Sequence, residues 1–375
     1  MSFFIWKSSP GLSGLLWYFL GLFSSIPAGG LLSAYLSEKT SPKISFSLGI
    51  LSKAALLLAI VLLKDSFLSH LVWFGVLSGA SLGFYAVPLN SLHDYISGNF
   101  VEKLTATNSA ISGSIGVFIP TFGAFMLSFG IPYSFLFILS SICGLIAAAF
   151  CLFVKTTTPT DRNFEILSIL SPRNLTRDKL ILLAVEFVEG IKSGFLWAFG
   201  GIICLSLLNG IGKWGVFNFI FSSITVILSF VAGRTLNEKL SRPIVVATGF
   251  LYSLACLFLS LHFDLKFFVF YSFLGCFVSA FGGASFGGTL NRILREDPQF
   301  SNLRHEYFAL REFPAMVGRI LPLVVLLLLN TKEINSLGSR LAFVLVGFIP
   351  LISLSLLDIS HLWKGNPNLL LEKEN

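Results

Sequence analysis

Long apolar runs recur from one end of the chain to the other, with short polar segments between them. Each run has about 20 residues, the length that an α-helix needs to cross roughly 30 Å of hydrocarbon. Inside lipid every backbone polar group needs a protein partner, and these runs are too long for barrel strands. The pattern therefore predicts an all-α polytopic membrane protein with eleven spans. They lie near residues 11–35, 44–63, 68–89, 106–129, 133–154, 180–208, 214–233, 244–262, 267–290, 309–330 and 340–360.

The composition supports this class. Hydrophobic residues make up 54% of the 375 residues and charged residues 12%, whereas soluble domains carry about 25% charged residues. The first apolar run is too long for a cleavable signal peptide, whose apolar region has about 7–15 residues. The five cysteines fall inside predicted spans and are interpreted as small buried apolar residues without metal-site spacing. No cofactor and no metal are expected.

Basic residues are distributed unevenly between the two sides of the predicted membrane. Of 26 Lys and Arg residues, 17 lie on one side, six lie on the other, and Lys53, Lys192 and Arg319 lie inside spans. The positive-inside rule assigns the richer side to the cytoplasm. Eleven spans then place the N-terminus outside and the C-terminus in the cytoplasm. This distribution explains the net charge of +7 without a nucleic-acid partner.

Several short patterns occur twice in the same order. The matched pairs are Gly29 with Gly233, Leu36-Ser37 with Leu240-Ser241, Leu89-Asn90 with Leu290-Asn291, Gly116 with Gly318, and Pro120 with Pro322. Their offsets of 201 to 204 residues are nearly equal, so two homologous bundles in parallel orientation are predicted. This is one of the recurring symmetries of secondary transporters.

The repeat divides the chain into an N-terminal bundle of five spans (1–154), a cytoplasmic linker (155–179), a C-terminal bundle of six spans (180–360) and a cytoplasmic tail (361–375). The sixth run has no counterpart in the first half, which either an upstream start or the loss of a first helix explains. The linker stretch NFEILSIL is interpreted as solvated, with a short amphipathic helix on the membrane surface as the alternative.

The repeated Gly-x-x-x-Pro pairs lie inside apolar runs. Proline lacks an N–H and clashes with the carbonyl four residues earlier, which belongs to Gly116 before Pro120 and to Gly318 before Pro322. Glycine there lets the helix bend and lets a neighbouring helix approach the freed carbonyl. The matched bends suit two bundles that rock against each other. A fixed kink needed only for packing is the alternative.

Four further stretches carry a family resemblance: GLLSAYLSEK and GRTLNEKLSR at matching positions, IPTFGA (Ile119–Ala124), and GFYAVPLNSL (Gly83–Leu92). With five plus six spans and a basic central loop, the chain resembles the major facilitator superfamily, which has six plus six, without its first helix. GLLSAYLSEK and GRTLNEKLSR resemble the family's cytoplasmic motif, but counted from Gly29 and Gly233 its aspartate position holds Ser33 and Asn237, so the acidic member of that motif is replaced in both halves. IPTFGA resembles the antiporter motif and favours an exporter. GFYAVPLNSL resembles a segment of lysophospholipid transporters.

Ionisable residues inside a span cost roughly 2.5–3.5 kcal/mol each at mid-membrane and therefore indicate function. In VEFVEGIKSGFLWAFGG (Val185–Gly201) one helical face carries the polar and small residues. They are Glu186, Glu189, Gly190, Ser193, Gly194, Trp197 and Gly201. The resemblance implies that this helix lines a central cavity. Glu186 or Glu189 is predicted to bind a proton or a substrate charge; a local pair of Glu189 with Lys192 is the alternative.

Other polar residues in the spans have two interpretations each. Glu312 and Arg319 share one face of the tenth run, where Arg319 either counters an anionic substrate, pairs with Glu189, or serves as a structural partner between helices. Lys53 lies on a helix that the resemblance places outside the cavity, so it is expected to pack or snorkel.

The Gly-rich stretch Gly275–Gly288 is expected to pack closely against another helix, or to line the cavity with nearby polar residues. Those candidates are Ser279, Ser285 and Asn291, with Tyr85 and Asn90 on the equivalent helix of the first half. His93 and His305 are expected in solvated cytoplasmic loops. The segment 292–312 is interpreted as a solvated face, with a partner site as the alternative.

These features predict a secondary active transporter that moves a small or amphipathic solute by alternating access, with proton-coupled efflux as an antiporter. The alternatives are a lysophospholipid or lipid flippase-type transporter of the same superfamily, and a non-transporting membrane paralogue. An enzyme is not predicted, because the sequence has no Asp-rich pair, His-Glu-x-x-His or Ser-His-Asp set. The expected partners are substrate, protons and membrane lipids. The expected form is a monomer in the bacterial cytoplasmic (inner) membrane.

Overall fold

The computed structural model describes residues 4–5, 12–97, 101–154, 164–169, 171, 176–208, 210–236, 238–295, 302–328 and 337–359. Within these ranges the chain is helical and contains no strand. The first half consists of α2 (Ser13–Lys39), α3 (Pro42–Leu63), the 3₁₀ helix η1 (Lys64–His70), α4 (Leu71–Ser97), α5 (Val101–Ser128) and α6 (Tyr133–Leu152). After α7 (Ile166–Ile169), the second half consists of α8 (Arg177–Leu208), α9 (Ile211–Thr235), α10 (Glu238–Leu261), α11 (Leu265–Phe277), the π-helical turn η2 (Val278–Gly282), α12 (Gly283–Arg295), α13 (Arg304–Leu328) and α14 (Leu337–Ile359).

The predicted fold class is confirmed. Among the described residues, ten helical segments are long and apolar enough to cross a membrane, with α11, η2 and α12 forming one of them. The tenth predicted run corresponds to α13, which has 25 residues but carries Arg311, Glu312 and Arg319 and is therefore more polar than the others. Several helices extend past the predicted runs into polar sequence, and α4 continues to Ser97.

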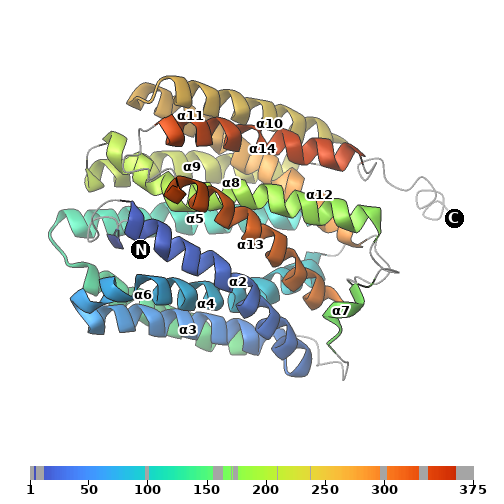
Figure 1. Ribbon diagram of the computed structural model, residues 1–375, viewed down its shortest axis with the longest axis horizontal. Coiled ribbons are helices and arrows are strands. Elements are labelled where there is room, and N and C mark those ends of the chain that lie inside the picture. The colour runs from blue at the N-terminus through green and yellow to red at the C-terminus, as the bar shows by residue number, and fades with distance from the viewer. Residues whose placement is uncertain are drawn as a thin grey trace.

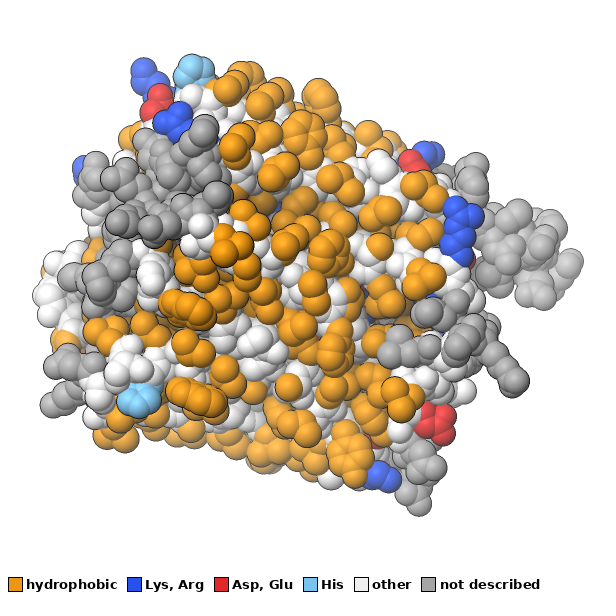
Figure 2. Space-filling model, viewed as in Figure 1, with side chains coloured by type: hydrophobic (Ala, Val, Ile, Leu, Met, Phe, Trp, Pro, Cys, Tyr) orange, Lys and Arg blue, Asp and Glu red, His pale blue; other side chains and the backbone are white. Residues whose placement is uncertain are grey.

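The surface agrees with a lipid environment. Figure 2 shows hydrophobic side chains over the middle of the visible face, with the charged side chains and histidines near its two ends. We call the end that carries α7 the linker end, and the other the opposite end (Figure 1). Exposed Phe, Ile and Leu residues are numerous on α5 and α6, including Phe118, Phe122 and Phe150. An apolar belt of this kind needs a solvent less polar than water.

The two halves meet along two helix pairs. In the first half α2 packs on α4 and α3 on α6, and in the second half α8 packs on α13 and α10 on α14. Across the halves, α2 contacts α13 and α5 contacts α9. In Figure 1, α2 and α13 lie side by side near the centre, between α3 and α4 on one side and α10 and α11 on the other.

Helix α5 is attached mainly to the second half. It packs extensively on α9 and also on α12, whereas its contact with α4 is small. In the second half the equivalent helix, α13, packs extensively on α8. Within the described chain the first half has no helix equivalent to α8.

The linker end is closed by an apolar cluster that joins both halves. Buried residues from α2, α4, α7, α12 and α13 contribute to it, including Ala34, Val87, Ile169 and Leu310. The backbone N–H of Glu165 donates to Glu306 Oε1 at 3.3 Å, and Glu306 is buried. In the described part of the linker, Ile169 is buried in this cluster and Phe164 and Ile166 pack against it, whereas Glu165 and Leu167 are exposed. The segment 164–169 is therefore packed on one side, where the prediction of a solvated linker is wrong, and exposed on the other.

Two histidines also depart from expectation, because both lie in helices rather than loops. His93 belongs to α4 and His305 to α13. His305 Nδ1 lies 2.8 Å from Ser91 Oγ, so a hydrogen bond joins α13 to α4 across the halves. The prediction that residues 292–312 form a solvated face is wrong for the start of α13, where five consecutive residues from Glu306 to Leu310 are buried. Residues 296–301 lie outside the described ranges.

The cysteines are buried only in part. Cys204, Cys256 and Cys276 are buried thiols, whereas Cys143 is exposed and Cys151 half-buried on α6. Both exceptions lie on a helix with a largely uncovered outer face, so the expectation of five buried cysteines is wrong for α6.

Candidate functional site

Small residues bring α8 and α13 into direct contact. A Cβ added at Gly318 would overlap the carbonyl oxygen of Phe187, and one added at Gly190 would lie 2.5 Å from the carbonyl oxygen of Ala315. Close backbone approach through small residues is typical of helix pairs in membranes. The charged side chains of the two helices are therefore held beside one another at this contact.

Glu186 and Arg311 form an ion pair between α8 and α13. Arg311 Nε donates to Glu186 Oε1 at 2.7 Å, and its Nη2 contacts the same oxygen. Both side chains are mostly shielded, with 16% of Glu186 and 23% of Arg311 exposed. A charge-assisted contact of this type stabilises the ionised form of both groups. Arg311 was not among the residues singled out by sequence analysis.

Glu189 has weaker partners and lies beside a cavity. Its carboxylate contacts the ammonium of Lys192 one turn later and accepts a hydrogen bond of 2.8 Å from Ser353 Oγ of α14. The pair of Glu189 with Lys192, the local alternative in the sequence analysis, is therefore present. Both side chains line a cavity of about 430 Å³ between α8, α10, η2 and α14. The Gly-rich stretch lines the same cavity with Gly275, Ser279 and neighbouring residues.

Glu312 and Arg319 pair with each other along α13. Arg319 Nη1 donates to Glu312 Oε2 at 2.8 Å, and each side chain is 15% exposed. The guanidinium also lies 5.8 Å from the ring centre of Trp197. Arg319 therefore does not pair with Glu189, which was one of the predicted arrangements. Trp197 in turn lies 6.0 Å from the ring of Phe23 on α2, at the boundary between the halves.

The embedded charges of the second half balance one another. Three carboxylates face three cations in three contacts, all within α8 and α13. A balanced cluster lowers the cost of placing charge in a membrane. It also means that this cluster alone does not require a substrate of either sign.

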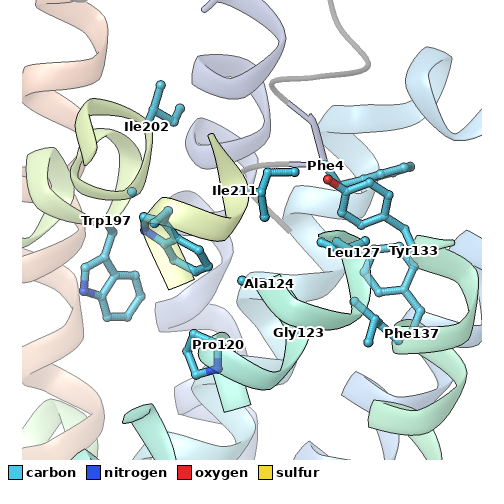
Figure 3. Close-up of a pocket in the computed structure, with 13 residues that line it drawn as sticks. Phe4, Pro120, Gly123, Ala124, Leu127, Tyr133, Phe137, Trp197, Ile202 and Ile211 are labelled. Carbon is cyan, nitrogen blue, oxygen red and sulfur yellow. The ribbon is translucent and has the colours of Figure 1, made fainter. Parts of the chain in front are cut away.

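Trp197 borders a second cavity, of about 370 Å³, between α5, α6, α8 and α9. Figure 3 shows Trp197 and Pro120 on one side of it, and Phe4, Tyr133 and Phe137 on the other. The ring of Phe4 lies 5.3 Å from that of Tyr133 and 5.5 Å from that of Phe137. The walls of this cavity are predominantly apolar and aromatic, as in many small-molecule sites.

The remaining predicted residues are not part of the charge cluster. Tyr85 lines a third cavity, in the first half, and its ring centre lies 5.3 Å from that of Phe46 in a tilted arrangement. Asn90 is exposed at the linker end of α4, and Asn291 is half-buried on α12.

The two kink glycines lie in different surroundings. Gly318 is tightly packed against α8, whereas nothing lies within 4 Å of a Cβ added at Gly116. The Gly116 carbonyl accepts a hydrogen bond of 3.1 Å from Asn218 Nδ2 on α9. The approach of a neighbouring helix to the freed carbonyl is therefore present in the first half. Pro120 and Pro322 both lie inside their helices without ending them.

No known protein family profile matches the chain. A relative is the uncharacterized protein YqgE of Bacillus subtilis (strain 168), 22% identical over 380 residues, covering 99% of this chain and 87% of that protein. Similar solved structures include the human organic anion transporter MFSD10 (TETRAN), with a TM-score of 0.63, 15% identity, and coverage of 92% of this chain and 83% of that chain.

Two further solved structures have a similar fold. The major facilitator superfamily transporter FucP in its outward conformation gives a TM-score of 0.60 at 14% identity, covering 91% of this chain and 89% of that chain. The nucleoside transporter NupG gives 0.61 at 11% identity, covering 94% and 95%. The chain has the major facilitator fold. All three of these proteins are transporters.

Within the major facilitator fold, the residues at the degenerate cytoplasmic motif have structural contacts. Ser33 Oγ donates to the carbonyl of Phe84 on α4 at 2.9 Å. Arg234 lies 4.1 Å from the ring of Phe230, one turn earlier on α9. Asn237 lies outside the described residues. The serine that stands at the aspartate position thus ties α2 to α4.

Arg311, Ser353 and Asn218 were not among the predicted site residues. Arg311 and Ser353 lie close to span ends, where a polar residue gives no signal of its own. Asn218 was detectable as an isolated amide inside the apolar run 214–233. Lys53 was expected to pack or snorkel, and its ammonium packs against α4 through a contact with Ser78 Oγ.

Proposed function

We propose that this protein is a secondary transporter that moves a small or amphipathic solute by alternating access, and that Glu189 carries its coupling proton. The observation that carries the proposal is the position of Glu189. It lines a cavity of about 430 Å³ inside a major facilitator fold, and its partners are one lysine and one serine. Glu186 is a weaker candidate, because a guanidinium contacts it through two nitrogens.

Protonation of Glu189 would remove its attraction for Lys192 while leaving the serine hydrogen bond possible. A carboxylate in a poorly solvated site can carry a proton between conformations. Lys192 would then be available to a solute or to Ser353. Proton binding to Glu189 would thus favour binding of an anionic solute to Lys192 and oppose binding of a cationic solute to Glu189. The second case is the competition that an antiporter needs.

Alternating access requires the halves to separate at one end at a time. Apolar clusters join the halves near both ends: one links Ala34 and Val87 to Leu310 at the linker end, and the other links α2 to α8 and α13. We propose that the linker end faces the cytoplasm, as the charge bias indicates, and that the membrane is the bacterial cytoplasmic membrane. We also propose that the functional form is a monomer.

The proposal is tested first with purified protein in mild detergent. A thermal-shift panel of amphipathic cations, sugars, organic anions and lysophospholipids identifies ligands, because a ligand of the folded state raises the melting temperature. The panel is repeated on Glu189→Gln and Arg319→Ala. The solutes found are then added to proteoliposomes that contain a pH-sensitive dye.

Wild-type protein should move protons when a transported solute is added, and Glu189→Gln should exchange solute without moving protons. Asp358→Asn, which alters an exposed pair with Arg242, is the matched control and should behave like wild type. Proton movement that persists in Glu189→Gln would exclude Glu189 as the coupling site. A folded protein that moves no solute of the panel would favour a non-transporting paralogue, and a lysophospholipid response would revive the lipid alternative, which the comparisons do not favour.

A further inference from the structure

One cavity of the first half contains an embedded charge that the proposed transport cycle does not use. This cavity has about 470 Å³ and lies between α2, α3, α4 and α6, with Trp197 of α8 on its border. Its polar lining includes Lys53, Ser78, Ser81 and Tyr85. Its volume is within the range of sites for small organic molecules.

Lys53 lies near the middle of the membrane. It is the twelfth of the 22 residues of α3, so at 1.5 Å per residue it lies about halfway along the helix. A lysine at this depth is too far from either end to reach water by extending its side chain alone. The position therefore needs a partner within the protein or a ligand.

The described residues give Lys53 one partner. Its ammonium contacts Ser78 Oγ, and no carboxylate of the described chain lies within ion-pair distance. An ammonium has three donors, so two remain for another group. Ser78 is fully buried and also accepts a hydrogen bond of 3.1 Å from the Tyr18 hydroxyl. These contacts join α2, α3 and α4, and since Lys53 is itself exposed they hold its ammonium at an open wall of the cavity.

The second half shows how the same architecture balances a lysine. Its cavity between α10, η2 and α14 is bordered by α8, which supplies both Lys192 and Glu189. Helix α3 contains no aspartate or glutamate, so Lys53 has no carboxylate one turn away on its own helix as Lys192 has.

We infer that the Lys53 cavity binds an amphipathic anion. A carboxylate, sulfonate or phosphate takes the two remaining donors of Lys53, and an aromatic or alkyl body lies against Trp197, Tyr85 and Phe19, which line the cavity. Aromatic walls around one fixed charge suit a ligand with an anionic end and an apolar body. The inference rests on the cavity itself and does not require transport or proton coupling. A free organic anion and an anionic lipid headgroup share this chemistry.

The test is equilibrium dialysis of the full-length, delipidated protein in an uncharged detergent, with radiolabelled 2-naphthoate as the probe and a detergent-only blank. The neutral probe 2-naphthalenemethanol has the same ring system without the charge. The variants are Lys53→Met, which removes the charge, and Lys53→Arg, which keeps it. Lys266→Met removes an exposed lysine at the start of α11 and is the matched control. If Lys53→Met does not give a folded, monodisperse protein, Lys53→Gln is used in its place, because it also removes the charge.

We expect saturable naphthoate binding in wild type, Lys53→Arg and Lys266→Met. Loss of the ammonium should weaken it by about tenfold to a hundredfold, the range for hydrogen bonds to charged groups. Binding of the neutral probe should be the same in all variants. Equal naphthoate binding by wild type and Lys53→Met, or no saturable binding by wild type, would overturn the inference.

A second arm identifies the source of the anion. Naphthoate binding is measured in nanodiscs of phosphatidylcholine with and without phosphatidylglycerol. Competition by phosphatidylglycerol in both wild type and Lys53→Arg, the two forms that keep the charge, identifies a lipid headgroup. Absence of competition identifies a free organic anion.

Discussion

Asn218 of α9 donates a hydrogen bond of 3.1 Å to the carbonyl oxygen of Gly116 on α5. This carbonyl is the one that Pro120 leaves without its helical donor. The bond therefore satisfies a half-buried backbone group and joins the two halves with the same contact. The Gly-x-x-x-Pro pair of the first half contacts another helix through this hydrogen bond, whereas Gly318 of the second half does so by close packing against α8.

Replacing Asn218 by alanine should reduce the free energy of unfolding by about 0.5 to 1.5 kcal/mol, the range for hydrogen bonds between membrane helices. In a Pro120→Ala background the cost should be smaller, because the new N–H can donate to Gly116 within the helix. Denaturation by SDS in mixed micelles gives the free energy of unfolding of the four proteins in this double-mutant cycle. Equal costs in both backgrounds would show that the bond does not depend on the proline. Thr225→Ala, which removes a bond within α9, is the control.

The two kink glycines should respond differently to the same substitution. Gly318→Ala places a methyl group against the Phe187 carbonyl, and such overpacking costs about 1–3 kcal/mol. Gly116→Ala adds its methyl group to open space, so it should be neutral or stabilise α5 by up to about 1 kcal/mol through helix propensity. Thermal denaturation of both variants in detergent tests this. A destabilised Gly116→Ala would indicate that a further segment occupies that space.

The Glu186–Arg311 pair should be far more sensitive than a surface pair. Glu186→Ala leaves a shielded guanidinium without its carboxylate, and breaking a buried pair in this way costs about 3–5 kcal/mol. Arg242→Ala breaks an exposed pair with Asp358, in which the side chains are 54% and 39% exposed, and should cost less than about 1 kcal/mol. Unfolding curves of both variants give the comparison.

The double variant Glu186→Ala with Arg311→Leu should recover much of the lost stability, since it removes both charges. A double variant as unstable as Glu186→Ala alone would mean that the glutamate is needed for a contact other than Arg311.

Cross-linking the linker end should arrest the proposed cycle. Ser91 and His305 belong to different halves and lie 2.8 Å apart at their side-chain atoms. In a background without the native cysteines, Ser91→Cys with His305→Cys and a short bifunctional thiol reagent should stop solute movement in proteoliposomes, and a reductant should restore it. Ser47→Cys with Ala148→Cys joins α3 to α6 within one half and should leave movement intact. Full activity of the first cross-linked pair would contradict separation of the halves at this end.

Much of the fold could be predicted because a helix that crosses lipid needs an apolar segment of a definite length. The spans, their order and the fold class follow from it, and α13 was found despite its charges. The extension of α4 to Ser97 and the burial of Glu306 could not be predicted. Both depend on packing at the linker end, where polar residues are covered by residues distant in the sequence.

Most of the charged residues of the candidate site could be predicted from the sequence, but the ion pairs that they form could be predicted less well. Glu189 and Lys192 are neighbours on one helix, so periodicity alone was sufficient. Glu186 with Arg311 depends on the separation of α8 and α13, which glycines on both helices determine. The contact of Lys53 with Ser78 joins α3 to α4, and the sequence alone does not identify a partner on another helix.

The attachment of α5 to α9 divides the molecule differently from its sequence repeat. If the halves rock as proposed, α5 travels with the second half, so the moving bodies are not the two repeats. The boundary then crosses the short connection Phe129–Pro132 between α5 and α6. Gly130 in this connection has φ of +82°, a conformation that costs glycine little and other residues more. The hinge of the transporter would therefore lie inside its first repeat as well as at its linker.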